Sequence, residues 1–319
     1  MPFVTPFFLE LKIYKNLQDV PALKRPILTI GTFDGVHKGH VHIIRRLVEE
    51  AESIDGQTVM LTFFPHPRMV LFPEDHGLKL LNTPDEKAYL LQRAGINHLV
   101  TLPFSSDFSR MTPFNYIRDI LVNALHVHKV VVGYDHHFGR NREGTIADLK
   151  EYAEMYHYQV EEIAAHEVKD IRVSSTKIRK AITDGNVTLA SFLLGYDYML
   201  SGMVTKGDGI GRKIQFPTAN IVPEFKWKLI PGQGVYACRI SFGNQKHVAM
   251  VNIGTRPTVS QSQELKIEAH ILDWEGDLYD QRVTLEFVTR IREERTFDSV
   301  DSLARQLMKD KEKTAELFR

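Results

Sequence analysis

Residues 31–40 read Gly-Thr-Phe-Asp-Gly-Val-His-Lys-Gly-His, and this stretch determines what the first half of the chain can form. The apolar run Ile27–Ile30 comes directly before it and reads as a buried strand. Between Val41 and Ala51, apolar residues recur at the spacing of one helix face. The stretch is therefore predicted to be a strand-to-helix turn, whose three glycines let the backbone bend tightly and approach a ligand.

The start of the predicted helix suits a negatively charged ligand. Free backbone N–H groups and the partial positive charge of a helix N-terminus favour a phosphate there. His37 and His40 are three residues apart, so both imidazoles can face the same anion. An ordinary surface turn would explain one glycine and one histidine, but not the whole pattern. The stretch lacks the Gly-x-x-x-x-Gly-Lys-Ser/Thr sequence, which excludes a P-loop here.

Strands and helices alternate through the rest of the first half. Further strands are predicted at residues 58–64, 99–102, 129–132 and 159–163, and helices at 84–95, 113–125 and 145–156. This alternation predicts an α/β domain with a doubly wound parallel sheet over residues 1–186. Such sheets bind ligands beyond the carboxyl ends of their strands. Chemically distinctive loops follow three of the strands, so we expect a single site formed by residues 31–40, 64–68 and 133–140.

In the second half of the chain, residues 187–319, the pattern of predicted secondary structure is different. Short strands are predicted at residues 198–205, 235–242, 247–253, 265–272 and 282–291, with turns between them. This spacing predicts a small antiparallel β-barrel. An amphipathic helix is expected at 299–313, with Leu303, Leu307 and Met308 on one face. Because turn residues surround Asn186, we place the domain boundary there and expect residues 187–319 to fold alone.

Two segments of the second half carry candidate chemistry. Residues 206–220 contain three glycines within five residues and end in Phe-Pro-Thr-Ala-Asn. Glycine N–H groups can hold phosphates, and hydroxyl and amide oxygens such as those of the closing Thr-Ala-Asn can bind Mg²⁺. A flexible hairpin would explain the glycines alone. In residues 266–271, strand alternation places Glu268 on the polar face, where it has either a functional role or none.

Composition excludes several classes of protein. Lys plus Arg equals Asp plus Glu, 40 each among 319 residues, so no charge excess points to a nucleic acid or a membrane surface. The single cysteine, Cys238, excludes an internal disulfide framework and fits a reducing compartment. Because no apolar run reaches the roughly 20 residues of a membrane span, we expect a cytoplasmic protein. The sequence does not indicate an oligomeric state.

The pattern Gly-x-Phe-Asp-Gly-x-His-x-Gly-His resembles the signature of the HxGH nucleotidyltransferases, in the branch found in bacterial bifunctional riboflavin kinase/FAD synthetase. Residues 173–179, Val-Ser-Ser-Thr-Lys-Ile-Arg, resemble the family pattern ISSTxxR. The resemblance implies that the first domain transfers an adenylyl group from ATP to FMN, with His37 and His40 as catalytic residues. It assigns contacts with ATP to Gly31, Phe33, Asp34, Gly39, Thr176 and Arg179. It assigns flavin binding to Pro65, His66, Pro67, Asp135 and Phe138.

Residues 207–220 resemble the riboflavin kinase signature GxxxGRxxGFPTAN, with Gln215 in place of a glycine. The resemblance implies that the second domain phosphorylates riboflavin to FMN with ATP. It assigns Glu268 the role of general base toward the riboflavin 5′-hydroxyl. It assigns ATP binding to Gly207, Gly211 and Arg212, and Mg²⁺ to Thr218 and Asn220. The implied partners are the small molecules riboflavin, FMN and ATP, with Mg²⁺ as cofactor.

Three other functions stay open on the sequence alone. One is a homologue with a single working activity, the kinase, because His136 stands where the family has an aromatic residue. Another is a non-catalytic flavin-binding regulator, which would have no use for the base Glu268. The last is a nucleotidyltransferase for a different phosphorylated substrate, although an attached kinase domain would make FMN the natural acceptor.

Overall fold

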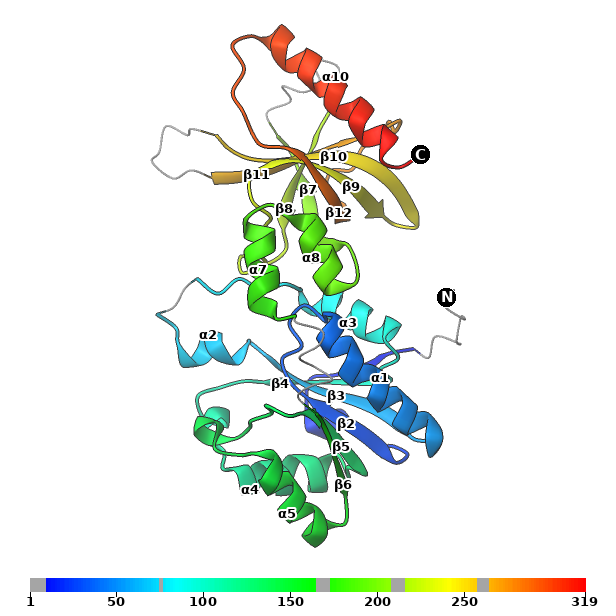
Figure 1. The fold of residues 1–319 in the computed structure, drawn as a ribbon, viewed down its shortest axis with the longest axis vertical. Helices are drawn as coiled ribbons and strands as arrows, with labels where there is room; N and C mark the ends of the chain where they lie inside the picture. The colour runs from blue at the N-terminus through cyan, green and yellow to red at the C-terminus, as the bar shows by residue number, and fades with distance from the viewer. Residues whose placement is uncertain (1–9, 75–76, 165–172, 208–215, 257–263) are drawn as a thin grey trace. The chain divides into compact units, whose positions relative to one another are not determined.

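The computed structural model describes residues 10–74, 77–164, 173–207, 216–256 and 264–319. The chain divides into two compact units (Figure 1). The first contains residues 1–78 and 87–174, and the second contains residues 79–86 and 175–319. The contacts thus place residues 79–86 and 175–186 with the second unit, whereas the sequence-based boundary at 186/187 places them with the first.

The first unit is built on a six-stranded parallel sheet, as predicted. In order across the sheet, the strands are β1 (Lys12–Tyr14), β4 (His98–Pro103), β3 (Gln57–Phe64), β2 (Pro26–Ile30), β5 (Lys129–Gly133) and β6 (Gln159–Ile163). The sequence does not predict β1, which is three residues long and mostly exposed. Central β2 is buried at every position, because helices cover both faces of a doubly wound sheet.

Helices lie on both faces of this sheet (Figure 1). One face carries an apolar core, formed by η3 and α5 against alternate residues of β2, β3, β4 and β5. Helix α1 contacts β2, β3 and β5. The helical segments are η1 (Leu17–Asp19), α1 (Lys38–Ser53), α2 (Pro67–Leu71), α3 (Pro84–Arg93), η2 (Phe108–Arg110), α4 (Pro113–Asn115), η3 (Tyr116–Ala124), η4 (Arg140–Arg142) and α5 (Ile146–Tyr156).

The second unit is a closed antiparallel barrel, which confirms the predicted fold class. Around the barrel the strands are β10 (Gln245–Arg256), β11 (Glu264–Ile271), β8 (Ala219–Pro223), β7 (Tyr198–Thr205), β12 (Arg282–Arg292) and β9 (Gly234–Phe242). The sequence does not predict strand β8, since only one of its five residues is buried. It nevertheless closes the barrel by pairing with both β7 and β11.

In the described part of the second unit, three helices accompany the barrel: α7 (Ser175–Thr183), α8 (Val187–Leu194) and α10 (Val300–Glu316). Ser299 caps α10 by accepting a hydrogen bond from the Ser302 backbone N–H. Leu307 of α10 packs on the barrel core, as its place on the predicted apolar face requires. Met308 is 52% exposed, so the predicted apolar face is wrong at this residue. Among the described residues, no helix combines the length and apolarity needed to cross a membrane.

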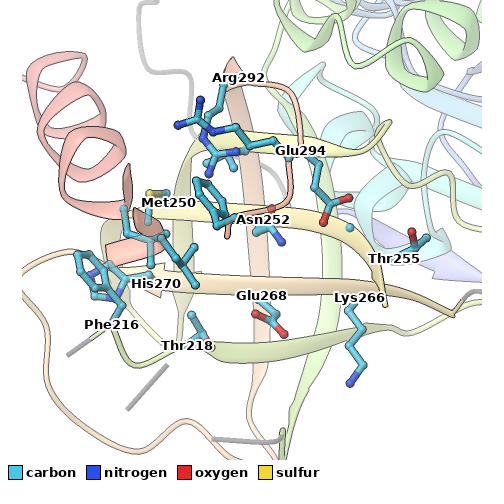
Figure 2. Close-up of a pocket in the computed structure, with 16 residues that line it drawn as sticks. Phe216, Thr218, Met250, Asn252, Thr255, Lys266, Glu268, His270, Arg292 and Glu294 are labelled. Carbon is cyan, nitrogen blue, oxygen red and sulfur yellow. The ribbon is translucent and has the colours of Figure 1, made fainter. Parts of the chain in front are cut away.

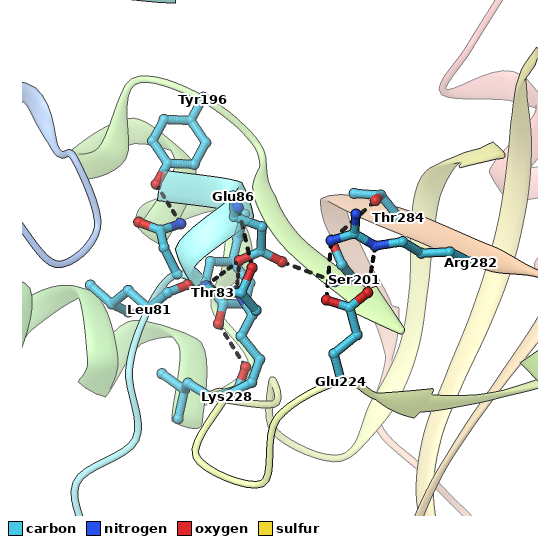
Figure 3. Close-up of polar contacts among 12 residues, drawn as sticks. Leu81, Thr83, Glu86, Tyr196, Ser201, Glu224, Lys228, Arg282 and Thr284 are labelled. Atoms are coloured by element: carbon cyan, nitrogen blue, oxygen red, sulfur yellow. Dashed lines mark hydrogen bonds and ion pairs between the residues drawn. The ribbon is translucent and has the colours of Figure 1, made fainter. Parts of the chain in front are cut away.

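Residues 79–86 join the second unit through a buried ion pair (Figure 3). The Lys228 ammonium lies 2.5 Å from Glu86 Oε2 and donates to the Leu81 carbonyl at 2.6 Å. Glu86 also accepts hydrogen bonds from the backbone N–H groups of Thr83 and Ser201, each at 2.9 Å. The side chains of Lys228 and Glu86 are 0% and 3% exposed. Breaking a buried pair leaves one charge uncompensated, at a cost of about 3–5 kcal/mol.

We therefore expect Glu86→Ala to lower the free energy of unfolding of the second unit by about 3–5 kcal/mol. The double variant Glu86→Ala/Lys228→Met should recover much of this loss, because it removes both charges. Asp85→Ala is the matched control, since its ion pair with Arg282 is exposed and worth less than about 1 kcal/mol. Urea unfolding of the full chain measures all three variants. Equal effects of Glu86→Ala and Asp85→Ala would contradict the role of the buried pair.

Residues 187–319 alone lack Glu86 and so leave Lys228 without its carboxylate partner. By the same reasoning, we expect that fragment to be less stable than the intact chain. Independent folding of the fragment stays a prediction.

Candidate functional site

The turn after β2 has an unusual backbone. Phe33, Gly35 and Val36 have φ angles of 44°, 96° and 35°. This left-handed region is rare for a bulky or β-branched residue, and such strain clusters at functional sites. Gly31 is required by a close approach, because a Cβ atom there would lie 2.8 Å from the Phe33 ring. The turn packs inward, with Phe33 and Asp34 only 4% and 3% exposed.

This turn brings His37 and His40 together at the N-terminus of α1. His37 caps the helix, and its Nδ1 accepts a hydrogen bond from the His40 backbone N–H at 3.3 Å. The two imidazole rings stack with centroids 3.6 Å apart and planes at 14°. Gly39 allows this packing, since a Cβ atom there would lie 3.3 Å from the His37 ring. The structure therefore brings the two predicted histidines together at a helix N-terminus.

His40 is held uncharged by its surroundings. Burial is the main cause that lowers its pKa well below the usual value, and the nearby His37 and Lys87 lower the pKa further. Its Nδ1 atom is buried and has no hydrogen-bond partner within the described part of the chain. A buried polar atom without a partner indicates a missing ligand or water. A neutral imidazole here can still donate one N–H to a phosphate oxygen.

Sequence reasoning missed Lys87, which reaches the same turn from α3. Its ammonium donates to the Thr32 carbonyl at 2.6 Å. No motif marks it, because its role depends on where α3 packs rather than on its neighbours in sequence.

The other predicted loops of the first unit lie at the same edge of the sheet. Strand β2 has β3 on one side and β5 on the other, so the carboxyl ends of these three parallel strands meet there. The connections after β3 and β5 leave in opposite directions, and this crevice is where open α/β sheets bind ligands. Residues Pro65, His66 and Pro67 follow β3, and His66 caps α2 by accepting from the Arg68 backbone N–H.

Some residues of the loop after β5 are exposed and others are buried. Asp135 is exposed. Phe138 is 6% exposed and packs on Tyr116, with ring centroids 5.3 Å apart. His136 stacks on Phe138 at 5.8 Å and 20°. Burial lowers the pKa of His136 to about 4, and His137 and Arg142 also lower it, whereas Asp135 raises it. At neutral pH, His136 is therefore an uncharged ring that packs like an aromatic side chain.

The depressed pKa of His136 predicts acid lability. Between pH 6.5 and about 4, the unfolded chain binds a proton that the folded chain does not, so stability falls as pH falls through this range. We expect His136→Phe to lose less thermal stability than wild type between pH 7.5 and 5.5. His137→Phe is the control, because its side chain is exposed. Parallel losses in wild type and His136→Phe would contradict the prediction.

Two other residues predicted to contact ATP, Thr176 and Arg179, lie in α7. Thr176 is exposed, and the Arg179 Nε–H donates to the Lys79 carbonyl at 2.8 Å within the second unit. Two predicted ATP-binding residues of the second half, Gly211 and Arg212, lie outside the described residues.

A pocket of about 240 Å³ opens in the barrel (Figure 2). Thr218 and Glu268 both line it, so two predicted functional residues share one cavity. Alternation along β11 works as predicted: Ile267 and Ala269 are buried, whereas Glu268 faces the pocket. The residues that line the pocket are Phe216, Thr218, Val235, Met250, Asn252, Gly254, Thr255, Lys266, Glu268, His270, Arg292, Glu294, Arg295, Phe297, Leu303 and Leu307.

The register of β8 against β11 brings Asn220 to Glu268. These residues are directly opposite each other in the antiparallel pair. Opposite residues share a face of the sheet, with Cβ atoms about 4.5–5.5 Å apart. Gly207 lies against the same amide, because a Cβ atom there would meet Asn220 Nδ2 at 1.9 Å. The barrel thus gathers Gly207, Thr218, Asn220 and Glu268 around one edge.

Several pocket residues give no clear sequence signal. His270 is 7% exposed, and its Nδ1–H donates to the Pro217 carbonyl at 2.9 Å, next to Thr218. Burial lowers the pKa of His270, although its bond to Pro217 opposes the shift. Arg292 is fixed by α10, where its Nε donates to buried Asp310 at 2.9 Å. These residues lie far apart in the sequence and meet only when the barrel closes.

The donors at this edge suit a small hard cation. Thr218 and Asn220 offer a hydroxyl and an amide oxygen, and Mg²⁺ prefers oxygen ligands. Mg²⁺ usually takes few protein ligands and completes its shell with waters and substrate phosphates, so two neutral oxygens fit that pattern.

Comparisons with known proteins match both halves of the chain. A family model described as FAD synthetase matches residues 20–177, and one described as riboflavin kinase matches residues 194–318. The chain is 36% identical over 292 residues to a bifunctional riboflavin kinase/FMN adenylyltransferase of Listeria monocytogenes, covering 92% of each chain. It is 35% identical over 304 residues to the protein of the same name from Escherichia coli K12, covering 95% of this chain and 96% of the relative.

A solved structure also matches along nearly the whole chain. It is described as a macrolide-efflux protein from Streptococcus pneumoniae. The two are 34% identical with a TM-score of 0.85, and the match covers 96% of this chain and 98% of the other. The likeness confirms that both folds, the α/β sheet and the barrel, are shared.

Proposed function

Because this chain belongs to the family of bifunctional riboflavin kinase/FMN adenylyltransferases, we propose how its residues divide the two reactions. The barrel transfers the γ-phosphate of ATP to riboflavin and releases FMN. The α/β unit transfers the adenylyl group of a second ATP to FMN and releases FAD and pyrophosphate. The observation that carries the proposal is the register that sets Asn220 opposite Glu268 beside a pocket.

In the kinase reaction, Glu268 acts as the general base. As the riboflavin 5′-oxygen attacks the γ-phosphorus, its proton passes to the Glu268 carboxylate and the bond to ADP breaks. Thr218 lines the same pocket and Asn220 lies opposite Glu268, which supports our assignment of both residues to the nucleotide phosphates. The missing side chain of Gly207 leaves room for the Asn220 amide, and we assign Gly207, Gly211 and Arg212 to ATP.

Magnesium is part of this proposal. Thr218 Oγ1 and Asn220 Oδ1 would hold the cation, with the ATP phosphates as further ligands. When bound, Mg²⁺ neutralises charge on the phosphates and orients them for attack.

In the adenylyl reaction, the protein needs no nucleophile of its own. A phosphate oxygen of FMN attacks the α-phosphorus of ATP, and pyrophosphate leaves. His37 and His40 donate N–H groups to the phosphates as charge builds, at a helix N-terminus that also favours anions. Gly31, Phe33, Asp34 and Gly39 shape this turn around the phosphates. We assign Thr176 and Arg179 to the β- and γ-phosphates.

The flavin of this second reaction is assigned to the loops after β3 and β5. Pro65, His66 and Pro67 contribute from one loop and Asp135 from the other. Phe138 packs in the core, so its role is to support that loop through His136. An uncharged, stacked His136 replaces the usual aromatic ring without adding charge, which favours two working activities over a kinase-only homologue.

Supplying each substrate separately tests the assignment. The purified chain with ATP and Mg²⁺ should convert riboflavin to FMN, and FMN to FAD with release of pyrophosphate. FMN formation without FAD would support the kinase-only alternative, and binding of flavin without any product would support the regulator. We further propose that the enzyme works in the cytoplasm on these small molecules and requires neither nucleic acid nor a membrane.

A further inference from the structure

Lys87, on α3, contacts the strained turn that follows β2 in the first unit. Its ammonium lies 2.6 Å from the Thr32 carbonyl oxygen, which also accepts from the Thr62 hydroxyl at 3.4 Å. Thr32 directly precedes Phe33, where the backbone enters its left-handed conformation. A charge-assisted hydrogen bond at this point holds the start of a conformation that the chain would otherwise rarely adopt.

The same ammonium sets the charge around His40. Burial lowers the pKa of Lys87, and the buried Asp34 carboxylate raises it. In turn, burial, His37 and Lys87 lower the pKa of His40, in decreasing order of effect. The titratable groups that face His40 are thus His37 from its own helix and Lys87 from α3, and Asp34 faces Lys87.

We propose that Lys87 is a positioning residue for adenylyl transfer, which fixes the Thr32 carbonyl and thereby the turn that carries His37 and His40. The proposal rests on the assignment of His37 and His40 to that reaction. Lys87 acts through the turn: it orients the stacked imidazoles, and its charge makes protonation of His40 unfavourable. His40 then keeps the neutral form at the pH of the cell.

Substitutions of Lys87 separate the hydrogen bond from the charge. Lys87→Met removes both, and Lys87→Gln keeps an amide donor without the charge. We expect Lys87→Met to lower kcat for FAD formation from FMN roughly 10- to 100-fold, the range for loss of a charge-assisted hydrogen bond. The KM for FMN should stay largely unchanged, and riboflavin phosphorylation should stay normal. Arg93→Met is the control, because Arg93 is an exposed cation on the same helix.

The second readout is the titration of His40 by NMR, with the signal assigned from the spectrum of His40→Ala. Removing the charge in Lys87→Met or Lys87→Gln should raise the pKa of His40 toward its usual value, and Lys87→Arg should not. A normal FAD rate in Lys87→Met, or an unmoved His40 titration in Lys87→Gln, overturns the proposal. If His40→Ala itself forms FAD normally, the site assignment fails, which is a different result from a failure of Lys87 alone.

Discussion

Glu268→Gln is expected to lower the rate of FMN formation by roughly 10²-fold or more, within the range usual for a general base. A primary alcohol is a poor nucleophile at neutral pH, so its attack on ATP depends on an acceptor for its proton. Glutamine keeps the size and hydrogen-bonding ability of the side chain but cannot accept that proton. Glu268 lines the barrel pocket together with Thr218. The rate of riboflavin phosphorylation under saturating ATP measures the effect.

Two controls make this result specific. Glu275→Gln is the same chemical change at an exposed position of the same unit, and it should leave the kinase rate unchanged. FAD formation from supplied FMN should be nearly normal in Glu268→Gln, because we assign no role in that reaction to Glu268 or its pocket. A normal kinase rate in Glu268→Gln would show that the residue is an ordinary polar side chain and that the proposed mechanism is wrong.

His37→Ala and His40→Ala are each expected to slow FAD formation by roughly 10²–10³-fold, the usual cost of one donor to developing charge. The two rings stack 3.6 Å apart at the start of α1, so each variant also disturbs the other ring. The effects should therefore be far from additive in the double variant. FMN should accumulate when riboflavin is supplied, because the barrel still works.

The matched control is His42→Ala, on the same helix but in a surface hollow with Arg45 and Glu161. It should form FAD at the normal rate. If His37→Ala and His40→Ala do so as well, the two histidines only pack and cap the turn, and the α/β site must be sought elsewhere.

The features that the sequence predicts correctly are those set by residues close together in the chain. The buried strand before residue 31, the helix after it and the pairing of His37 with His40 follow from spacing within one turn. The alternation around Glu268 follows from the period of a strand. Glu268 and Thr218 were assigned from motifs, and the fold then placed both beside one pocket.

Features that depend on contacts between residues far apart in the sequence could not be predicted in this way. Lys87 and Lys228 are unremarkable in sequence, and only the packing of α3 and the barrel gives them buried partners. His270 fixes Pro217 across 53 positions of sequence. Strand β1 is too short and too exposed for its sequence to predict a strand. It forms because β4 offers an edge to pair with.

The central claim is that one chain performs both transfers, and labelled ATP tests it most directly. The purified chain is incubated with riboflavin, Mg²⁺ and ATP labelled at either the γ- or the α-phosphate, and the flavins are separated by chromatography. The γ-label should enter FMN and then FAD, whereas the α-label should enter FAD alone. An α-label that reaches no flavin, or a γ-label that never enters FMN, would contradict the account.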